Sequence, residues 1–155
     1  IVGAGPVKYE AFLKQLILDC GVADHVILVG WRPVKQAISF MNVSDATLVP
    51  HMDNDHTSNT IPHKLFQSMN LGVPLLVSSC KPLKRIVEQV QSGIVFQAND
   101  AKDFGLKCRE LVNNASMRRQ FSENGKLATR SGIYTWEKEA EKLCQLYEQI
   151  GANHD

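Results

Sequence analysis

The sequence has no excess of positive or negative charge and no long hydrophobic run. Its 17 Lys and Arg residues balance 16 Asp and Glu residues, so the formal net charge over 155 residues is +1. This near neutrality gives no electrostatic reason to bind nucleic acid or an anionic membrane non-specifically. No apolar run approaches the roughly 20 residues that cross a bilayer, and the N-terminus shows neither a basic leader nor a cleavage signature. We expect a cytoplasmic protein that reaches a membrane, at its inner face, through another part of a longer chain.

Cysteine is scarce as well. Cys20, Cys80, Cys108 and Cys144 are widely spaced and form no C-x-x-C pair. This spacing disfavours a disulfide framework or a zinc site. It favours buried, reduced thiols in a reducing cytoplasm.

The composition itself is ordinary, with 44% hydrophobic and 21% charged residues. Such a chain is neither polar enough nor charged enough to be globally disordered. Its length fits one compact domain with a real core. We therefore expect a single domain over residues 1–155.

Short apolar runs alternate with segments of helical periodicity. We expect strands at 1–2, 25–30, 46–50, 74–79 and 93–96, and helices at 7–20, 33–43, 61–72, 83–91, 100–112, 116–130 and 134–150. This alternation predicts an α/β domain with a doubly wound, Rossmann-like parallel sheet and helices on both faces. Residues 153–155 are expected to fray. Because the chain opens at the end of a buried strand, we expect that it has lost what preceded that strand end.

Ligands of open α/β sheets bind beyond the carboxyl ends of the strands. The loop 50–60 ends there and leads directly into the helix that begins at Ile61. Free N–H groups and the helix dipole make such a helix start attractive to an anion. Lys64, in the first turn, opposes the dipole unless an anion also binds, although an ordinary solvated lysine is an equally weighted alternative.

Three other features can each be interpreted either as ordinary structure or as part of a functional site. Gly3-Ala4-Gly5-Pro6 looks like a phosphate loop, but Lys8 stands where the third glycine of G-x-G-x-x-G belongs, which favours a tight turn. Trp31 and Arg32 form either a wall for a planar base or a packing contact with a neighbouring helix. The polar residues of 51–63 match no metal motif, and a mobile polar loop without a metal is favoured; they are His51, Asp53, Asp55, His56 and His63.

Five segments together carry a family resemblance. They are IVGAGP at 1–6, HVILVGW at 25–31, SDATLVP at 44–50, TIPHKLFQSMNLGVP at 60–74 and GIVF at 93–96. In order and spacing they resemble the C-terminal, donor-binding domain of the group 1 retaining glycosyltransferases, which have the GT-B fold. The resemblance covers nearly the whole chain.

The resemblance implies a site for a nucleotide-sugar donor. It implies that Lys64 and Asn59 are catalytic. It also implies a set of donor-binding residues: Gly5, Trp31, Arg32, Thr60, Ile61, Pro62, His63, Leu65 and Gln67. Of these, Trp31 and Arg32 would approach the base, and the helix start at 61–65 would contact the diphosphate. Asn59 and Gln67 stand where the family often has two glutamates, one facing the sugar and one holding the ribose.

The implied function is transfer of a hexose from a UDP- or GDP-sugar to a glycan or lipid-linked acceptor, in bacterial polysaccharide synthesis, with no metal or cofactor. The resemblance also implies that the acceptor domain lies upstream of Ile1, together with the first strand and helix of the donor domain and their basic phosphate-contacting pair. This chain alone is therefore expected to be inactive. One alternative is a non-catalytic nucleotide-binding or assembly module on the same fold. Another is an epimerase that hydrolyses UDP-sugars, against which the amides of Asn59 and Gln67 count.

Overall fold

A computed structural model describes residues 1–152 of this chain. The predicted frayed end at 153–155 lies outside the described residues. By its internal contacts the chain divides into two compact units, residues 1–43 and residues 44–155. This division does not test the prediction of a single domain over 1–155, which stays a prediction.

Unit 1 holds two helices and two short extended segments. The helices are α1 (Val7–Asp19) and α2 (Val34–Asn42), and each begins after a proline, Pro6 or Pro33. The extended segments pair in parallel through a single bridge between Val2 and Gly30. The N–H of Gly3 donates to the Gly30 carbonyl at 2.9 Å, and the N–H of Val29 donates to the Ile1 carbonyl at 2.9 Å.

The regular strands predicted at 1–2 and 25–30 are therefore wrong as strands, although their parallel pairing is present. Within unit 1 each segment has the other as its partner, and a two-stranded pair is marginal in water. Ile27 is 72% exposed, so this apolar run lacks the cover that a buried strand needs.

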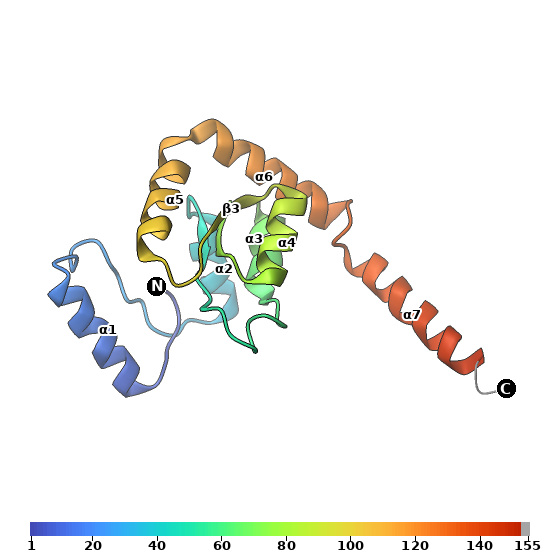
Figure 1. Cartoon of the computed structure of the whole chain (residues 1–155), viewed down its shortest axis with the longest axis horizontal. Coiled ribbons are helices and arrows are strands. Elements are labelled where there is room, and N and C mark those ends of the chain that lie inside the picture. Colours follow the sequence, from blue (N-terminus) through green and yellow to red (C-terminus); the bar gives the residue numbers. More distant parts are fainter. Residues whose placement is uncertain (153–155) are drawn as a thin grey trace. The chain divides into compact units, whose positions relative to one another are not determined.

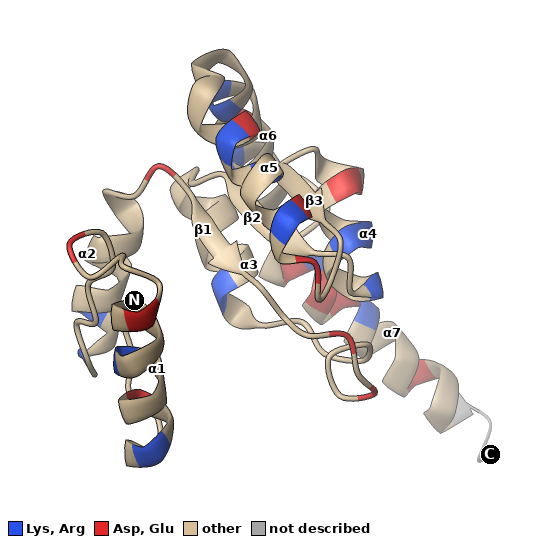
Figure 2. Cartoon of the chain, turned by 60° about the vertical axis from the view of Figure 1, so that its left-hand side comes forward, with Lys and Arg blue, Asp and Glu red and all other residues tan. Residues whose placement is uncertain are grey.

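Unit 2 is built on a three-stranded parallel sheet. The strands β1 (Thr47–Val49), β2 (Leu75–Ser78) and β3 (Gly93–Phe96) lie in the order β1-β2-β3 (Figure 2). Thr47 pairs with Leu75, and Leu75 pairs with Gly93. The sheet confirms the predicted parallel α/β architecture.

Helices cover both faces of this sheet. The helices α3 (His63–Leu71) and α4 (Lys81–Val90) pack on one face, where Leu75 and Val77 of β2 point. The helix α5 (Ala101–Asn113) packs on the other, against Leu76. Successive residues of a strand point to opposite faces, which explains this division. The helix α6 (Ala115–Arg130) contributes residues to both clusters.

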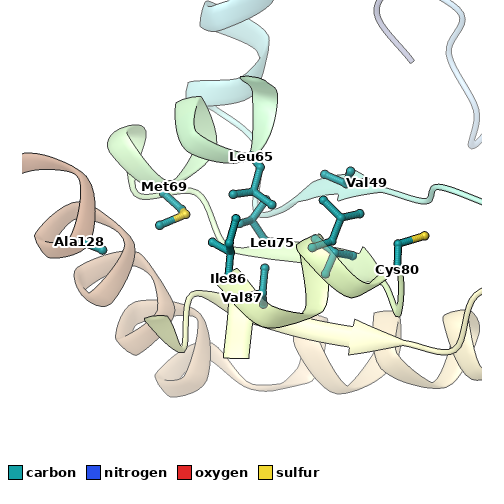
Figure 3. Packing of buried hydrophobic residues seen from close by; sticks show 10 residues of the cluster. Val49, Leu65, Met69, Leu75, Cys80, Ile86, Val87 and Ala128 are labelled. Atoms are coloured by element: carbon teal, nitrogen blue, oxygen red, sulfur yellow. The ribbon is translucent and has the colours of Figure 1, made fainter. Parts of the chain in front are cut away.

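The larger apolar cluster lies between β1, β2, α3 and α4. Figure 3 shows its side chains converging between these elements. Its members include Val49, Leu65, Met69, Leu75, Cys80, Ile86, Val87 and Ala128. This core holds the carboxyl end of β1 and the start of α3 in place, which is where the loop 50–62 lies.

The predicted helices are all present, with ends shifted by one or two residues. Gly72 ends α3 in the left-handed conformation at φ 74°. Asp100 caps α5 by accepting from the N–H groups of Lys102 and Asp103. The last helix, α7 (Trp136–Ala152), begins where Thr135 accepts from the N–H of Lys138, and it runs away from the sheet of unit 2 (Figure 1).

The four cysteines are free thiols, but their burial differs. Cys80 is buried and Cys108 half-buried, whereas Cys20 and Cys144 are exposed. The prediction of buried thiols is wrong for the last two, since Cys20 ends a helix without a buried residue and the neighbours of Cys144 on α7 are exposed. Among the described residues no helix is long and apolar enough to cross a membrane.

Candidate functional site

The loop between β1 and α3 lies at the carboxyl edge of the sheet in unit 2. Because the strands are parallel, it shares this edge with the segment after β2, which holds Ser79 and Cys80. The Sγ atom of Cys80 lies 3.7 Å from the carbonyl oxygens of His51 and Met52 and 3.9 Å from the hydroxyl of Thr57. The buried thiol therefore attaches the loop to the start of α4.

The polar side chains of this loop close turns within the loop. The hydroxyl of Thr57 donates to the Met52 carbonyl at 2.5 Å, and Ser58 donates to the carboxylate of Asp53 at 2.9 Å. The side-chain amide of Asn59 donates to the Asp55 carbonyl at 2.8 Å. Among the described residues, no group of three His, Cys, Asp or Glu is placed to hold a metal ion.

The loop leads directly into α3, and no side chain caps the start of this helix. Pro62 is the N-cap residue, and the first turn holds no acidic residue. The N–H of Leu65 donates to the Pro62 carbonyl at 3.0 Å, which leaves the N–H groups of His63 and Lys64 for a ligand. Uncapped N–H groups at the positive end of the helix dipole can bind an anion.

Lys64 is partly buried at this helix start. Burial lowers the pKa of its ammonium group. The ion pairs found among residues 1–152 join other lysines to glutamates and do not include Lys64. A partly buried cation without a counter-ion favours the anion interpretation over the solvated lysine.

His51, directly after Pro50, lies near Lys64. Its Nδ1 atom is buried and has no hydrogen-bond partner among the described residues. Burial lowers the pKa of the imidazole, and the positive charges of Lys64 and His56 lower it further. Sequence reasoning considered His51 only as a candidate metal ligand and missed its place beside Lys64. Its position one residue beyond a strand-ending proline could have indicated it.

The other predicted site residues of unit 2 have varied surroundings. The side chain of Leu65 lies in the core, and its N–H donates to the Pro62 carbonyl. Asn59 and Gln67 are exposed. The hydroxyl of Thr60 donates to the His56 carbonyl at 2.9 Å. Ile61 lines a cavity of about 570 Å³ together with Phe66, Tyr134 and Trp136, among others.

Three predicted site residues belong to unit 1. The N–H of Gly5 donates to the carboxylate of Glu10 at 3.0 Å, so that amide already has an acceptor. Trp31 is 68% exposed, and Arg32 donates to the Trp31 carbonyl at 2.7 Å. Their grouping with Lys64 in one site stays a prediction.

Comparison with known proteins identifies the family of the chain by sequence. The family model described as glycosyl transferases group 1 matches residues 1–128. An uncharacterized glycosyltransferase of Methanocaldococcus jannaschii is 25% identical over 97% of this chain and 40% of its own length. An amylovoran biosynthesis glycosyltransferase of Erwinia amylovora is 30% identical over 66% of this chain and 25% of its own length. The chain thus spans well under half the length of these relatives.

Solved structures agree on the fold. The chain resembles a sucrose-phosphate synthase from Thermosynechococcus elongatus with a TM-score of 0.81 and 19% identity, over 98% of this chain and 38% of that one. It also resembles an Anabaena protein, HepE, solved in complex with UDP, with a TM-score of 0.73 and 15% identity, over 93% of this chain and 40% of that one. The parallel sheet is thus of the type found in the C-terminal domain of GT-B proteins. By its family match over residues 1–128, this chain is a member of the group 1 glycosyltransferases.

Proposed function

We propose that this chain is the donor-binding domain of a glycosyltransferase that transfers a hexose from a UDP- or GDP-sugar. The observation that carries the proposal is the start of α3, which combines uncapped N–H groups with the partly buried Lys64. A nucleotide-sugar carries a diphosphate, which is the anion that such a helix start would bind.

The same groups would assist the reaction. Transfer breaks the bond between the sugar's anomeric carbon and the diphosphate oxygen, and negative charge grows on that oxygen as the bond breaks. Lys64 and the N–H groups of His63 and Lys64 would stabilise this charge, because they are positioned before the reaction begins. In this proposal protein groups alone stabilise the negative charge on the diphosphate oxygen, without a metal or other cofactor.

The family resemblance assigns further residues to the donor. Trp31 and Arg32 would contact the base, Gln67 the ribose and Asn59 the sugar. The side chains of Asn59 and Gln67 are exposed in unit 2, and Trp31 is exposed in unit 1, so each is accessible to a ligand. The N–H of Gly5 would donate to the ligand in place of the carboxylate of Glu10, which accepts from it in this structure.

The acceptor site would belong to the rest of a longer protein. The relatives are more than twice as long as this chain, which leaves room for a second domain. One relative is named for amylovoran biosynthesis, which supports a glycan or lipid-linked acceptor in bacterial polysaccharide synthesis. Such a protein would work in the cytoplasm, at the inner face of the membrane where the acceptor is anchored in lipid. By itself the chain would bind the donor without transferring the sugar.

Calorimetric titration with UDP and then GDP tests this proposal. The chain should bind one of them, and Lys64→Ala should weaken that binding about tenfold, as expected for loss of a charged contact. Lys81→Ala is the matched control, because Lys81 is an exposed lysine at the start of α4. Absence of binding to both nucleotides, or equal effects of the two substitutions, would contradict the proposal.

A further inference from the structure

The unpartnered imidazole of His51 is the feature of this site that its proposed chemistry leaves unexplained. Its Nδ1 atom is buried and has no hydrogen-bond partner in the described part of the chain. Leaving a buried polar atom unpaired costs free energy, so native structures rarely keep one without a reason.

Contacts of the backbone fix the position of His51 at the start of the loop. The carbonyl of His51 contacts the buried Sγ of Cys80, and the next carbonyl, of Met52, accepts from the Thr57 hydroxyl and also contacts that sulfur. Figure 3 shows the sulfur of Cys80 directed away from the apolar cluster. The backbone of the first two residues of the loop is thus anchored, which fixes the point from which the imidazole extends.

The burial of Nδ1 determines where a neutral ring carries its proton. An N–H group without an acceptor is rarer in protein interiors than an unpaired acceptor, so the proton belongs on Nε2. Unlike Nδ1, the Nε2 atom is not among the buried atoms that lack a partner, and no hydrogen bond is found for it among residues 1–152. It is therefore accessible and free to donate.

The charges around the ring favour an anion as the acceptor. Lys64 on α3 and His56 in the loop are the titratable groups that act on the imidazole, and neither can carry a negative charge. These groups and burial keep the ring neutral, so it does not add a further repelling charge to the site. A phosphate oxygen would accept from Nε2 and be attracted by Lys64 at the same time.

We propose that His51 is a donor-binding residue whose Nε2–H donates a hydrogen bond to a diphosphate oxygen of the nucleotide-sugar, next to Lys64. This inference rests on the proposed function and adds a contact to the same site. It makes the residue after Pro50 a ligand-binding position, in addition to the start of α3.

Two amide substitutions test which ring nitrogen matters. Glutamine can place an amide near the position of Nε2, whereas asparagine reaches only to the position of Nδ1. With the tighter-binding nucleotide of UDP and GDP, His51→Asn should weaken binding about tenfold, as for a lost hydrogen bond to a charged group. His51→Gln should stay within about twofold of the wild type, and His56→Gln is the control for replacing another imidazole of the same loop.

Nitrogen NMR of the wild-type chain provides a second readout that does not depend on a variant folding. We expect the chemical shifts of His51 to indicate the Nε2–H tautomer, and Nε2 to shift when the nucleotide is added. A Nδ1–H tautomer, an unmoved Nε2, or equal losses in His51→Asn and His51→Gln would overturn the inference.

The outcomes separate this inference from the proposed function. Binding that depends on Lys64 but is unchanged in His51→Asn would refute the role of His51 and leave the donor site standing. Absence of wild-type binding to both nucleotides would refute the donor site, and the inference with it.

Discussion

The sulfur of Cys80 lies 3.7 Å from the carbonyl oxygen of His51, although 29 residues separate the two in the sequence. Cys80 is fully buried at the start of α4, and His51 begins the loop that leads to α3. This contact joins the segments that follow β1 and β2, at the edge of the sheet where the candidate site lies.

Replacing Cys80 should therefore affect both stability and the loop. Cys80→Ala removes a buried sulfur and its contacts with the loop, and we expect a loss of about 1–2 kcal/mol in the free energy of unfolding. Urea denaturation measures this loss. Cys144→Ala, at an exposed cysteine, is the control and should change stability by less than about 0.5 kcal/mol. Equal effects would argue against a structural role for the Cys80 thiol.

Gly93 is required by the close approach of β2 and β3. A Cβ atom at this position would lie 2.1 Å from the backbone oxygen of Leu75, which cannot move without disturbing the ladder. We expect Gly93→Ala to destabilise unit 2 by about 3 kcal/mol or more, as overpacking against backbone does. Thermal denaturation measures the effect.

The matched substitution for Gly93→Ala is Gly105→Ala within α5. A Cβ atom there would meet nothing within 4 Å. Because alanine favours a helix interior over glycine, Gly105→Ala should stabilise the protein by about 0.5–1 kcal/mol. Destabilisation by Gly105→Ala, or tolerance of Gly93→Ala, would contradict this account of the two glycines.

The titration of His51 predicts a pH dependence of stability. Burial, Lys64 and His56 lower its pKa in the folded state below the ordinary value of 6.5. As the pH falls below 6.5 the unfolded chain gains a proton that the folded chain does not bind, so the folded state loses stability relative to the unfolded state. The loss continues down to the folded-state pKa and then stops.

Urea denaturation at pH 7.5 and pH 5.5 would test this dependence. The midpoint of the wild type should fall more between these pH values than that of His51→Asn, which cannot titrate. Subtracting the two curves removes the contribution of the other ionisable groups. Parallel curves would show that His51 has the same pKa in both states.

Asp100 stabilises the start of α5. Its carboxylate accepts from the N–H groups of Lys102 and Asp103 at 2.9 and 3.0 Å. Asp100→Ala should cost about 1 kcal/mol, and Asp100→Asn should restore most of that, since asparagine caps helices nearly as well. Circular dichroism during thermal denaturation measures both variants, and an unchanged melting temperature in Asp100→Ala would refute the cap.

Much of the fold follows from short stretches of sequence. Gly72 and Asp100 predicted helix ends that the structure contains, because a cap involves groups only a few residues apart. The strands of unit 2 were also predictable, since each is a short apolar run bounded by turn residues. The family resemblance likewise rested on motifs that can be read without a structure, and the match over residues 1–128 bears it out.

Burial and contacts between segments far apart in the sequence were decided only by the tertiary structure. The run at 25–30 has the composition of a strand, but a strand needs covered neighbours, and Ile27 remains exposed. Cys20 and Cys144 are exposed for a similar reason, since the apolar spacing of a helix does not say whether anything packs on it. The approach of His51 to Lys64, and the engagement of the Leu65 amide within the first turn of α3, likewise required the folded chain. Periodicity and caps are local properties of the backbone, whereas burial and the pairing of charges arise only when distant segments meet.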